Sequence, residues 1–188
     1  MRPLASIDIG SNAIRLAVGE LVDDGRLRII HDAREAIRLG QDVFGIGVIS
    51  EPTLARLFES FDRFKKLLSD FHVEHLRAVG TSALREARNQ REVVRAIAER
   101  TGIKIEIIRG EEEAELIHLA VSDRVELEDK LALLIDIGGG SVEVTLVDHG
   151  SIVRTESAPM GTVRLLKLLE QKKNPGKVLN RLIREYAQ

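Results

Sequence analysis

The spacing of apolar residues along the chain predicts an alternating series of strands and helices. Apolar, β-branched stretches at 4–9, 13–22 and 26–37 are typical of strands, and the short gap between the first two indicates a hairpin. The sheet is therefore expected to begin with antiparallel strands. The glycine-rich stretch 40–47 that follows is expected to be a loop.

Apolar residues spaced three and four apart then predict a long helix. Ser50 fits its N-cap and Pro52 fits its first turn. Because four of the five phenylalanines share the expected core face, we interpret them as packing residues. That face comprises Leu54, Leu57, Phe58, Phe61, Phe64, Leu67, Leu68 and Phe71.

The alternation continues to the end of the chain. Further strands are predicted at 76–80, 103–108, 131–137, 142–148 and 151–157. Helices are predicted at 81–88, from 91 to Gly102, at 111–121, from Gly161, and at 177–186. This order of elements indicates an α/β protein.

The opening pattern occurs twice, at Ile7–Asn12 and at Ile135–Ser141, with starting points 128 positions apart. Each copy combines a buried strand, an acidic residue, a glycine turn and a returning strand. Such a duplication predicts two related lobes that hold a ligand between two glycine turns. The charged segment 123–130 lacks periodicity, so the lobes are expected at 1–124 and 130–188, the second one incomplete.

The glycine turns favour a phosphate ligand. Glycine lacks a Cβ atom, so the backbone N–H groups can approach an anion closely, and the helix starts at Ser82 and Gly161 offer further donors. Each of these features also has an ordinary structural interpretation, as a turn, a solvated strand arginine or a helix cap. The candidate phosphate-binding residues are Ser11, Asn12, Arg15, Ser82, Arg85, Gly138, Gly139, Gly140 and Ser141.

Acidic residues near the turns suggest metal and proton chemistry. Asp8 and Asp136 would place one carboxylate from each lobe near the phosphate, and carboxylates tolerate a phosphate only with a hard cation or a polarised water between them. This pair predicts Mg²⁺ or a similar ion. In the run Glu111–Glu113, one glutamate would accept a proton from water attacking a phosphoanhydride, although acidic residues also favour a helix start.

Composition narrows the function classes. With 28 basic and 30 acidic residues, the chain has a net charge of −2, which argues against general nucleic-acid binding. The absence of cysteine excludes disulfides and thiolate metal sites. Without a long apolar run or a signal-peptide pattern, the chain is expected to be cytoplasmic and to have no membrane partner. Its five histidines lack the spacing of metal ligands.

Four segments, in order, resemble exopolyphosphatases and guanosine pentaphosphate phosphohydrolases, the Ppx/GppA phosphatase family. They are Ile7–Asn12, Gly80–Asn89, Gly110–Ala114 and Asp136–Ser141, followed by Met160 and Gly161. The resemblance covers essentially the whole chain. It implies the ribonuclease H-like lobes of the actin, hexokinase and heat-shock chaperone (ASKHA) fold, which close over a phosphate substrate and Mg²⁺.

By this resemblance, Glu113 corresponds to the catalytic base that activates water. Asp136, and also Asp8 and Glu143, would hold Mg²⁺ or the water. The chain departs from the family at Ala13 and Val142, which each replace a common hydroxyl residue, and it lacks the family's later glycine-threonine phosphate segment.

The expected function is therefore hydrolysis of phosphoanhydrides, with release of terminal phosphate from inorganic polyphosphate, guanosine pentaphosphate or both. The alternatives are a sensor that binds polyphosphate or an alarmone without hydrolysis, an ATP-using kinase of the same fold, and a folding domain without activity. Because its second lobe is expected to be incomplete, this chain should be weakly active or inactive. The apolar stripe of the last helix predicts a homodimer and comprises Val178, Leu179, Leu182, Ile183 and Tyr186.

Overall fold

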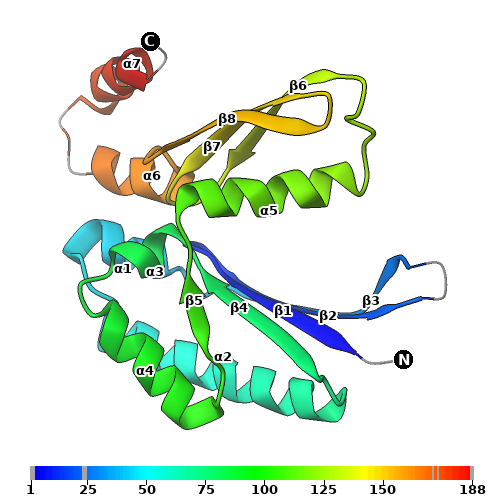
Figure 1. The fold of residues 1–188 in the computed structure, drawn as a ribbon. Coiled ribbons are helices and arrows are strands. Elements are labelled where there is room, and N and C mark those ends of the chain that lie inside the picture. Colours follow the sequence, from blue (N-terminus) through cyan, green and yellow to red (C-terminus); the bar gives the residue numbers. More distant parts are fainter. Residues whose placement is uncertain (1–2, 23–24, 171, 173, 187–188) are drawn as a thin grey trace. The chain divides into compact units, whose positions relative to one another are not determined.

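A computed structural model describes residues 3–22, 25–170, 172 and 174–186. The chain forms two compact units, Met1–Ile107 and Ile108–Gln188, and each unit contains one sheet (Figure 1). Within the described residues, no helix combines the length and apolar character needed to cross a bilayer.

The first unit contains a five-stranded sheet in the order β3-β2-β1-β4-β5. Strand β2 pairs antiparallel with β1 and β3, whereas β4 pairs parallel with β1 and β5, so the predicted antiparallel start is confirmed. The strands are β1 (Leu4–Ile9), β2 (Ile14–Leu21), β3 (Leu27–Glu35), β4 (His75–Gly80) and β5 (Ile105–Ile107).

Alternating side chains give this sheet one buried face. Ile7 and Ile9 on β1 are fully buried, whereas Asp8 between them is exposed. Helices α2 (Glu51–Asp70) and α4 (Gln90–Thr101) run along the sheet (Figure 1). The predicted core face of α2 is confirmed, because Leu57, Phe61 and Phe64 are fully buried and the other predicted members pack partly buried against the same core.

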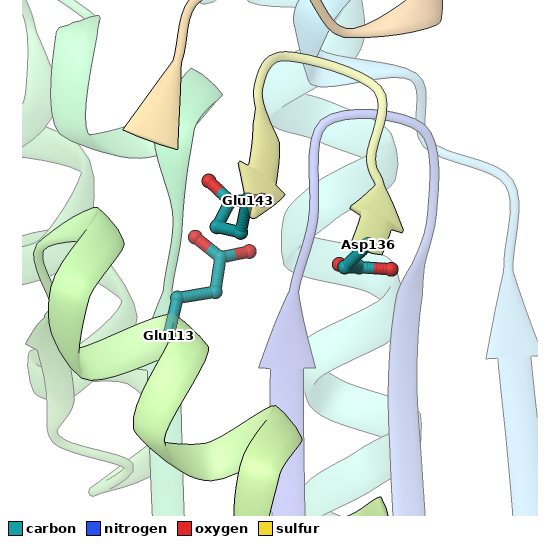
Figure 2. Close-up of side chains that lie close together, drawn as sticks. All are labelled: Glu113, Asp136 and Glu143. Atoms are coloured by element: carbon teal, nitrogen blue, oxygen red, sulfur yellow. The ribbon is translucent and has the colours of Figure 1, made fainter. Parts of the chain in front are cut away.

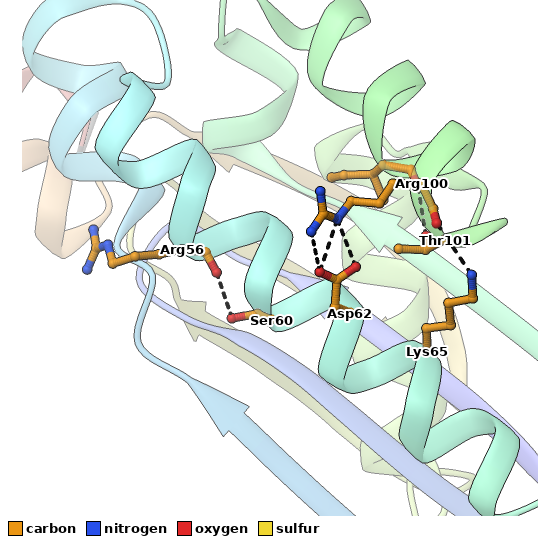
Figure 3. A network of polar contacts seen from close by, with 7 residues as sticks. Arg56, Ser60, Asp62, Lys65, Arg100 and Thr101 are labelled. Carbon is orange, nitrogen blue, oxygen red and sulfur yellow. Dashed lines mark hydrogen bonds and ion pairs between the residues drawn. The ribbon is translucent and has the colours of Figure 1, made fainter.

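A polar network links α2 to α4 on the outside of the unit (Figure 3). Arg100 donates to both carboxylate oxygens of Asp62, through Nε at 2.8 and 3.0 Å and through a terminal nitrogen at 2.5 Å. These hydrogen bonds lower the pKa of Asp62. Lys65 adds a 3.4 Å bond to the Arg100 carbonyl, so polar contacts fix the helix pair outside its apolar core.

The predicted loop at 40–47 is wrong, because this segment forms helix α1 (Leu39–Ile46). Gly40 is buried against Ser11, and Gly47 adopts a φ of 78° as the C-cap, where its N–H donates to the Val43 carbonyl. Two of the three glycines therefore serve helix packing and helix termination.

The predicted N-cap of α2 is confirmed at Ser50, but its hydroxyl donates to Asp42 of α1 at 2.6 Å instead of capping α2. Burial raises the pKa of Asp42, yet the hydrogen bonds from the Ser50 hydroxyl and amide outweigh burial and leave that pKa below its usual value. Ser50 thus connects α1 to α2.

The second unit contains a three-stranded antiparallel sheet in the order β6-β7-β8. Its strands are β6 (Leu131–Ile137), β7 (Val142–Asp148) and β8 (Ser151–Ala158), and its helices are α5 (Gly110–Ser122), α6 (Thr162–Glu170) and α7 (Pro175–Tyr186). Helix α5 lies along one face of the sheet (Figure 1). For this reason the compact units divide at Ile107/Ile108, earlier than the predicted boundary at 124–130.

The other face of this sheet is exposed and apolar. It comprises Leu131, Leu133, Ile135 and Ile137, all exposed, together with their half-buried cross-strand neighbours Val142, Val144 and Leu146. Among the described residues this face has no covering layer, which agrees with the predicted incomplete second lobe.

Candidate active site

Three carboxylates meet on the covered face of the second unit's sheet. Glu113 extends from α5 toward Glu143 of β7, and Asp136 lies on the neighbouring strand β6 (Figure 2). One carboxylate oxygen from each residue lies within 4.8 Å of the others. Asp136 and Glu143 are direct cross-strand partners, which places their side chains on the same face. We call this group the carboxylate cluster.

The three adjacent glutamates at the start of α5 occupy different environments. The N–H of Arg109 donates to Glu112 at 2.8 Å, in the manner of a capping box. Glu111 is exposed, and only Glu113 belongs to the carboxylate cluster. Glu113, which the family resemblance predicts as the base, is thus the one glutamate of this run that lies beside Asp136 and Glu143, and its catalytic role stays a prediction.

Gly110 determines how closely α5 approaches the sheet. A Cβ atom at this position would lie 2.5 Å from both Cβ and Oγ of Ser157 on β8. Because only glycine leaves room for this contact, the first turn of α5 sits directly over Ser157, and Glu113 follows one turn later. The packing of a single glycine thus positions the helix that carries Glu113.

Glu143 is 2% exposed, and its two oxygens have different surroundings. Oε1 accepts a hydrogen bond from Ser157 Oγ at 2.7 Å. Oε2 is buried without a hydrogen-bond donor among the described residues. A buried carboxylate needs compensation, and a cation beside two further carboxylates would supply it. An all-oxygen set of this kind suits Mg²⁺.

The loop between β6 and β7, Gly138–Ser141, is held from one side by the start of α6; we call it the glycine loop. The N–H of Thr162 donates to the Gly138 carbonyl at 3.0 Å, and those of Val163 and Arg164 donate to the Gly139 carbonyl at 2.9 and 3.1 Å. The sequence predicted that amides at this helix start would contact phosphate. These three amides do not fit that role, because they already donate their hydrogen bonds to carbonyls of the glycine loop.

This arrangement orients the amides of the glycine loop. In a trans peptide the carbonyl and the following N–H point in opposite directions. Because the carbonyls of Gly138, Gly139 and Gly140 all accept hydrogen bonds from α6 residues, the N–H groups of Gly139, Gly140 and Ser141 turn away from that helix. Successive amides that face one side form an anion-binding concavity.

The first unit repeats this construction. The N–H of Gly10 donates to the Ala13 carbonyl at 3.0 Å, and that of Gly138 donates to the Ser141 carbonyl at the same distance. The carbonyls of Ser11 and Asn12 accept hydrogen bonds from the amides of Gly40 and Arg38, which follow β3 as α6 follows β8. The sequence repeat therefore extends to the backbone hydrogen bonds of the turns.

The structure brings two of the predicted phosphate-binding side chains together. Ser11 and Ser82 are 4% and 3% exposed, and their hydroxyl oxygens lie 2.8 Å apart in a hydrogen bond that ties the first turn to α3 (Ser82–Glu86). Asn12 is exposed in the turn, and Arg15 is exposed on β2 directly across from Asp8 of β1.

Arg85 is half-buried on α3. Two further residues of the site, Ser157 and Arg164, could not be recognised from the sequence. The only available signal for Ser157 is its cross-strand register with Glu143.

Replacing Gly110 with alanine is expected to destabilise the chain by about 1–3 kcal/mol, because the added methyl group overpacks the contact with Ser157. Urea unfolding followed by circular dichroism measures the change. Gly176→Ala is the matched control, since a Cβ there meets no atom within 4 Å. Equal unfolding midpoints for Gly110→Ala and the wild-type chain would show that α5 does not depend on this contact.

The model of the Ppx/GppA phosphatase family matches residues 20–188. Exopolyphosphatase 2 of Mycobacterium tuberculosis is 34% identical over 171 residues, which cover 86% of this chain and 53% of that protein. A putative exopolyphosphatase of Haemophilus influenzae is 31% identical over 163 residues, which cover 87% and 50%. The chain spans about half the length of these relatives.

Solved structures agree with this assignment. The crystal structure of an exopolyphosphatase from Cytophaga hutchinsonii matches with a TM-score of 0.90 and 29% identity, over 98% of this chain and 60% of that one. The Ppx/GppA family member from Aquifex aeolicus matches with a TM-score of 0.79 and 30% identity, over the same shares. These neighbours confirm the predicted fold class.

Proposed function

Because the chain belongs to the Ppx/GppA phosphatase family, we propose that it forms part of a phosphoanhydride hydrolase that releases terminal phosphate from inorganic polyphosphate, guanosine pentaphosphate or both. The similar proteins from Mycobacterium tuberculosis and Cytophaga hutchinsonii are named exopolyphosphatases, which supports the polyphosphate part of this proposal.

One observation carries the proposal. The carboxylate cluster flanks the glycine loop, since Asp136 and Glu143 each lie two residues from an end of it. A phosphoryl group bound to the loop amides would therefore lie beside Glu113, Asp136 and Glu143. An anion-binding loop next to carboxylates is suited to phosphoryl transfer, in which positioning and electrostatics supply most of the catalysis.

The proposed reaction uses the residues of this chain in distinct roles. The amides of Gly139, Gly140 and Ser141 hold the terminal phosphoryl oxygens. Glu113 accepts a proton from a water molecule while the oxygen of that water forms a bond to the terminal phosphorus. The bridging P–O bond breaks, and the electron pair leaves with the shortened substrate. Orthophosphate is the second product.

The residues present fit a divalent cation. Asp136 and the buried Glu143 would hold Mg²⁺, and Asp8 of the first unit remains a predicted ligand. When bound, such an ion withdraws charge from phosphoryl oxygens and offsets the repulsion between phosphate and carboxylates. Glu143 keeps one oxygen on Ser157, which leaves Oε2 for the cation.

Phosphate release from polyphosphate and from guanosine pentaphosphate tests the proposal. This chain should be compared with a longer chain that carries the same residues, and the longer chain is expected to release orthophosphate from at least one substrate. Binding of polyphosphate without release would contradict the proposal and support a sensor. ATP-dependent transfer of phosphate to an acceptor would instead support a kinase.

Two further expectations remain predictions. The exposed apolar sheet face and the exposed Ile183 of α7 support self-association as a homodimer, whereas the side chain of Tyr186 lies outside the described residues. We also propose that the protein acts in the cytoplasm, where its charge balance and lack of cysteine are compatible with function.

A further inference from the structure

We propose that Arg164 is a positioning residue, which fixes the conformation in which the glycine loop presents its amides to phosphate. The inference rests on the proposed function and names a group that acts through the loop. Arg164 donates from Nε to the Gly140 carbonyl at 2.7 Å and from its backbone N–H to the Gly139 carbonyl at 3.1 Å. One residue therefore fixes two successive peptide planes.

The composition of the loop explains why an external constraint is needed. Three consecutive glycines have wide backbone freedom, so the loop itself does not select one conformation. The bond to the Gly140 carbonyl determines where the N–H of Ser141 points, and the bond to the Gly139 carbonyl does the same for Gly140. Without the Arg164 guanidinium, the hydrogen bond to the Gly140 carbonyl is lost, and with it the constraint on the Ser141 N–H.

The first unit supports this interpretation by contrast. Its turn has Ser11 at the position that corresponds to Gly139, and the Ser11 hydroxyl bonds to Ser82 at 2.8 Å. Its next residue, Asn12, corresponds to Gly140, and the Asn12 carbonyl accepts its hydrogen bond from the backbone N–H of Arg38 at 3.0 Å. In the second unit Gly139 has no side chain, and the Gly140 carbonyl is bound by the Arg164 guanidinium instead of a backbone amide.

Gly161 allows the helix start to come this close. A Cβ atom on Gly161 would lie 2.3 Å from the Gly140 nitrogen and 2.4 Å from the Gly139 carbonyl carbon. These neighbours are backbone atoms, which cannot move without changing the loop. Gly161 is buried, so α6 begins in direct contact with the loop and brings Arg164 within reach.

The amide resonances of Gly139, Gly140 and Ser141 in the ligand-free chain test this role. Arg164→Met is expected to shift or broaden these signals, and Arg164→Lys is expected to do so less, because its ammonium can still donate to the Gly140 carbonyl. Arg154→Met is the matched control, since Arg154 is an exposed arginine on β8 that pairs with Glu156. Titration with tripolyphosphate should move the same three signals in the wild-type chain.

Kinetics in the longer chain provide the second readout. Arg164→Met is expected to lower kcat/KM by about 10- to 100-fold through misplaced amides, with partial recovery in Arg164→Lys. Equal urea midpoints for the variants would confirm that folding is intact. A higher KM with unmoved ligand-free signals would overturn the proposal, because Arg164 would then contact phosphate directly. Unmoved signals with wild-type kinetics would overturn it as well.

The two readouts separate this inference from the proposed function. If the wild-type longer chain releases no phosphate, the proposed function fails, yet the ligand-free signals of Arg164→Met still decide whether Arg164 positions the loop.

Discussion

Replacing Glu113 with glutamine is expected to slow phosphate release by about 100- to 10,000-fold, the usual cost of losing a general base. Glutamine keeps the size of the side chain, so the packing of α5 on the sheet should persist. Only the capacity to accept a proton from water is lost. Substrate binding is therefore expected to stay within a small factor of the wild-type value.

The measurement is steady-state phosphate release by the longer chain, together with polyphosphate affinity by calorimetry. Glu111→Gln is the matched control, because Glu111 lies in the same helix turn but is exposed and lies outside the carboxylate cluster. Activity of Glu113→Gln within a few-fold of the wild-type rate would show that another group activates the water.

Removal of divalent cations is expected to abolish phosphate release, and added Mg²⁺ should restore it. The physical reason is the carboxylate cluster, in which three acidic side chains approach within 4.8 Å and would repel a polyanionic substrate. Phosphate release in excess chelator, followed by titration with Mg²⁺, measures the dependence. Full turnover in chelator would contradict the assignment of a metal site.

Cation binding by this chain provides a readout that does not depend on activity. Glu143→Gln is expected to weaken Mg²⁺ binding in calorimetry by about 10-fold or more, because a buried anionic ligand is replaced by a neutral one. The exposed Glu115 of α5 provides the control Glu115→Gln, for which binding should not change. Equal affinities for both variants would exclude Glu143 as a ligand.

The parts of the fold that follow from local sequence were predictable. Both glycine turns and the strands beside them have strong apolar patterns, and the core face of α2 follows from helical spacing. Helix α1 was missed because Gly40, Gly45 and Gly47 suggested a loop. Glycine occurs at position 40 because the residue there packs against Ser11, and at position 47 because the residue there ends the helix with a positive φ. Neither cause can be recognised from the local sequence.

The candidate site likewise contains residues that the sequence predicts and residues whose role depends on tertiary contacts. Asp136 was predicted as a site residue from the repeat, and Glu113 was predicted from its glutamate run by family resemblance; both lie in the carboxylate cluster. The contribution of Ser157 depends on pairing between β7 and β8, and that of Arg164 depends on the approach of α6 to the glycine loop. Neither contact is encoded in a local pattern, so neither could be predicted from spacing.

Hydrolysis of polyphosphate by the longer chain in water enriched in heavy oxygen tests the central claim most directly. Mass spectrometry of the products shows which phosphorus the water attacks. Attack on the terminal phosphorus predicts heavy oxygen in the released orthophosphate and none in the shortened polyphosphate. Heavy oxygen in the shortened chain would contradict the account, because the water would then have attacked the neighbouring phosphorus.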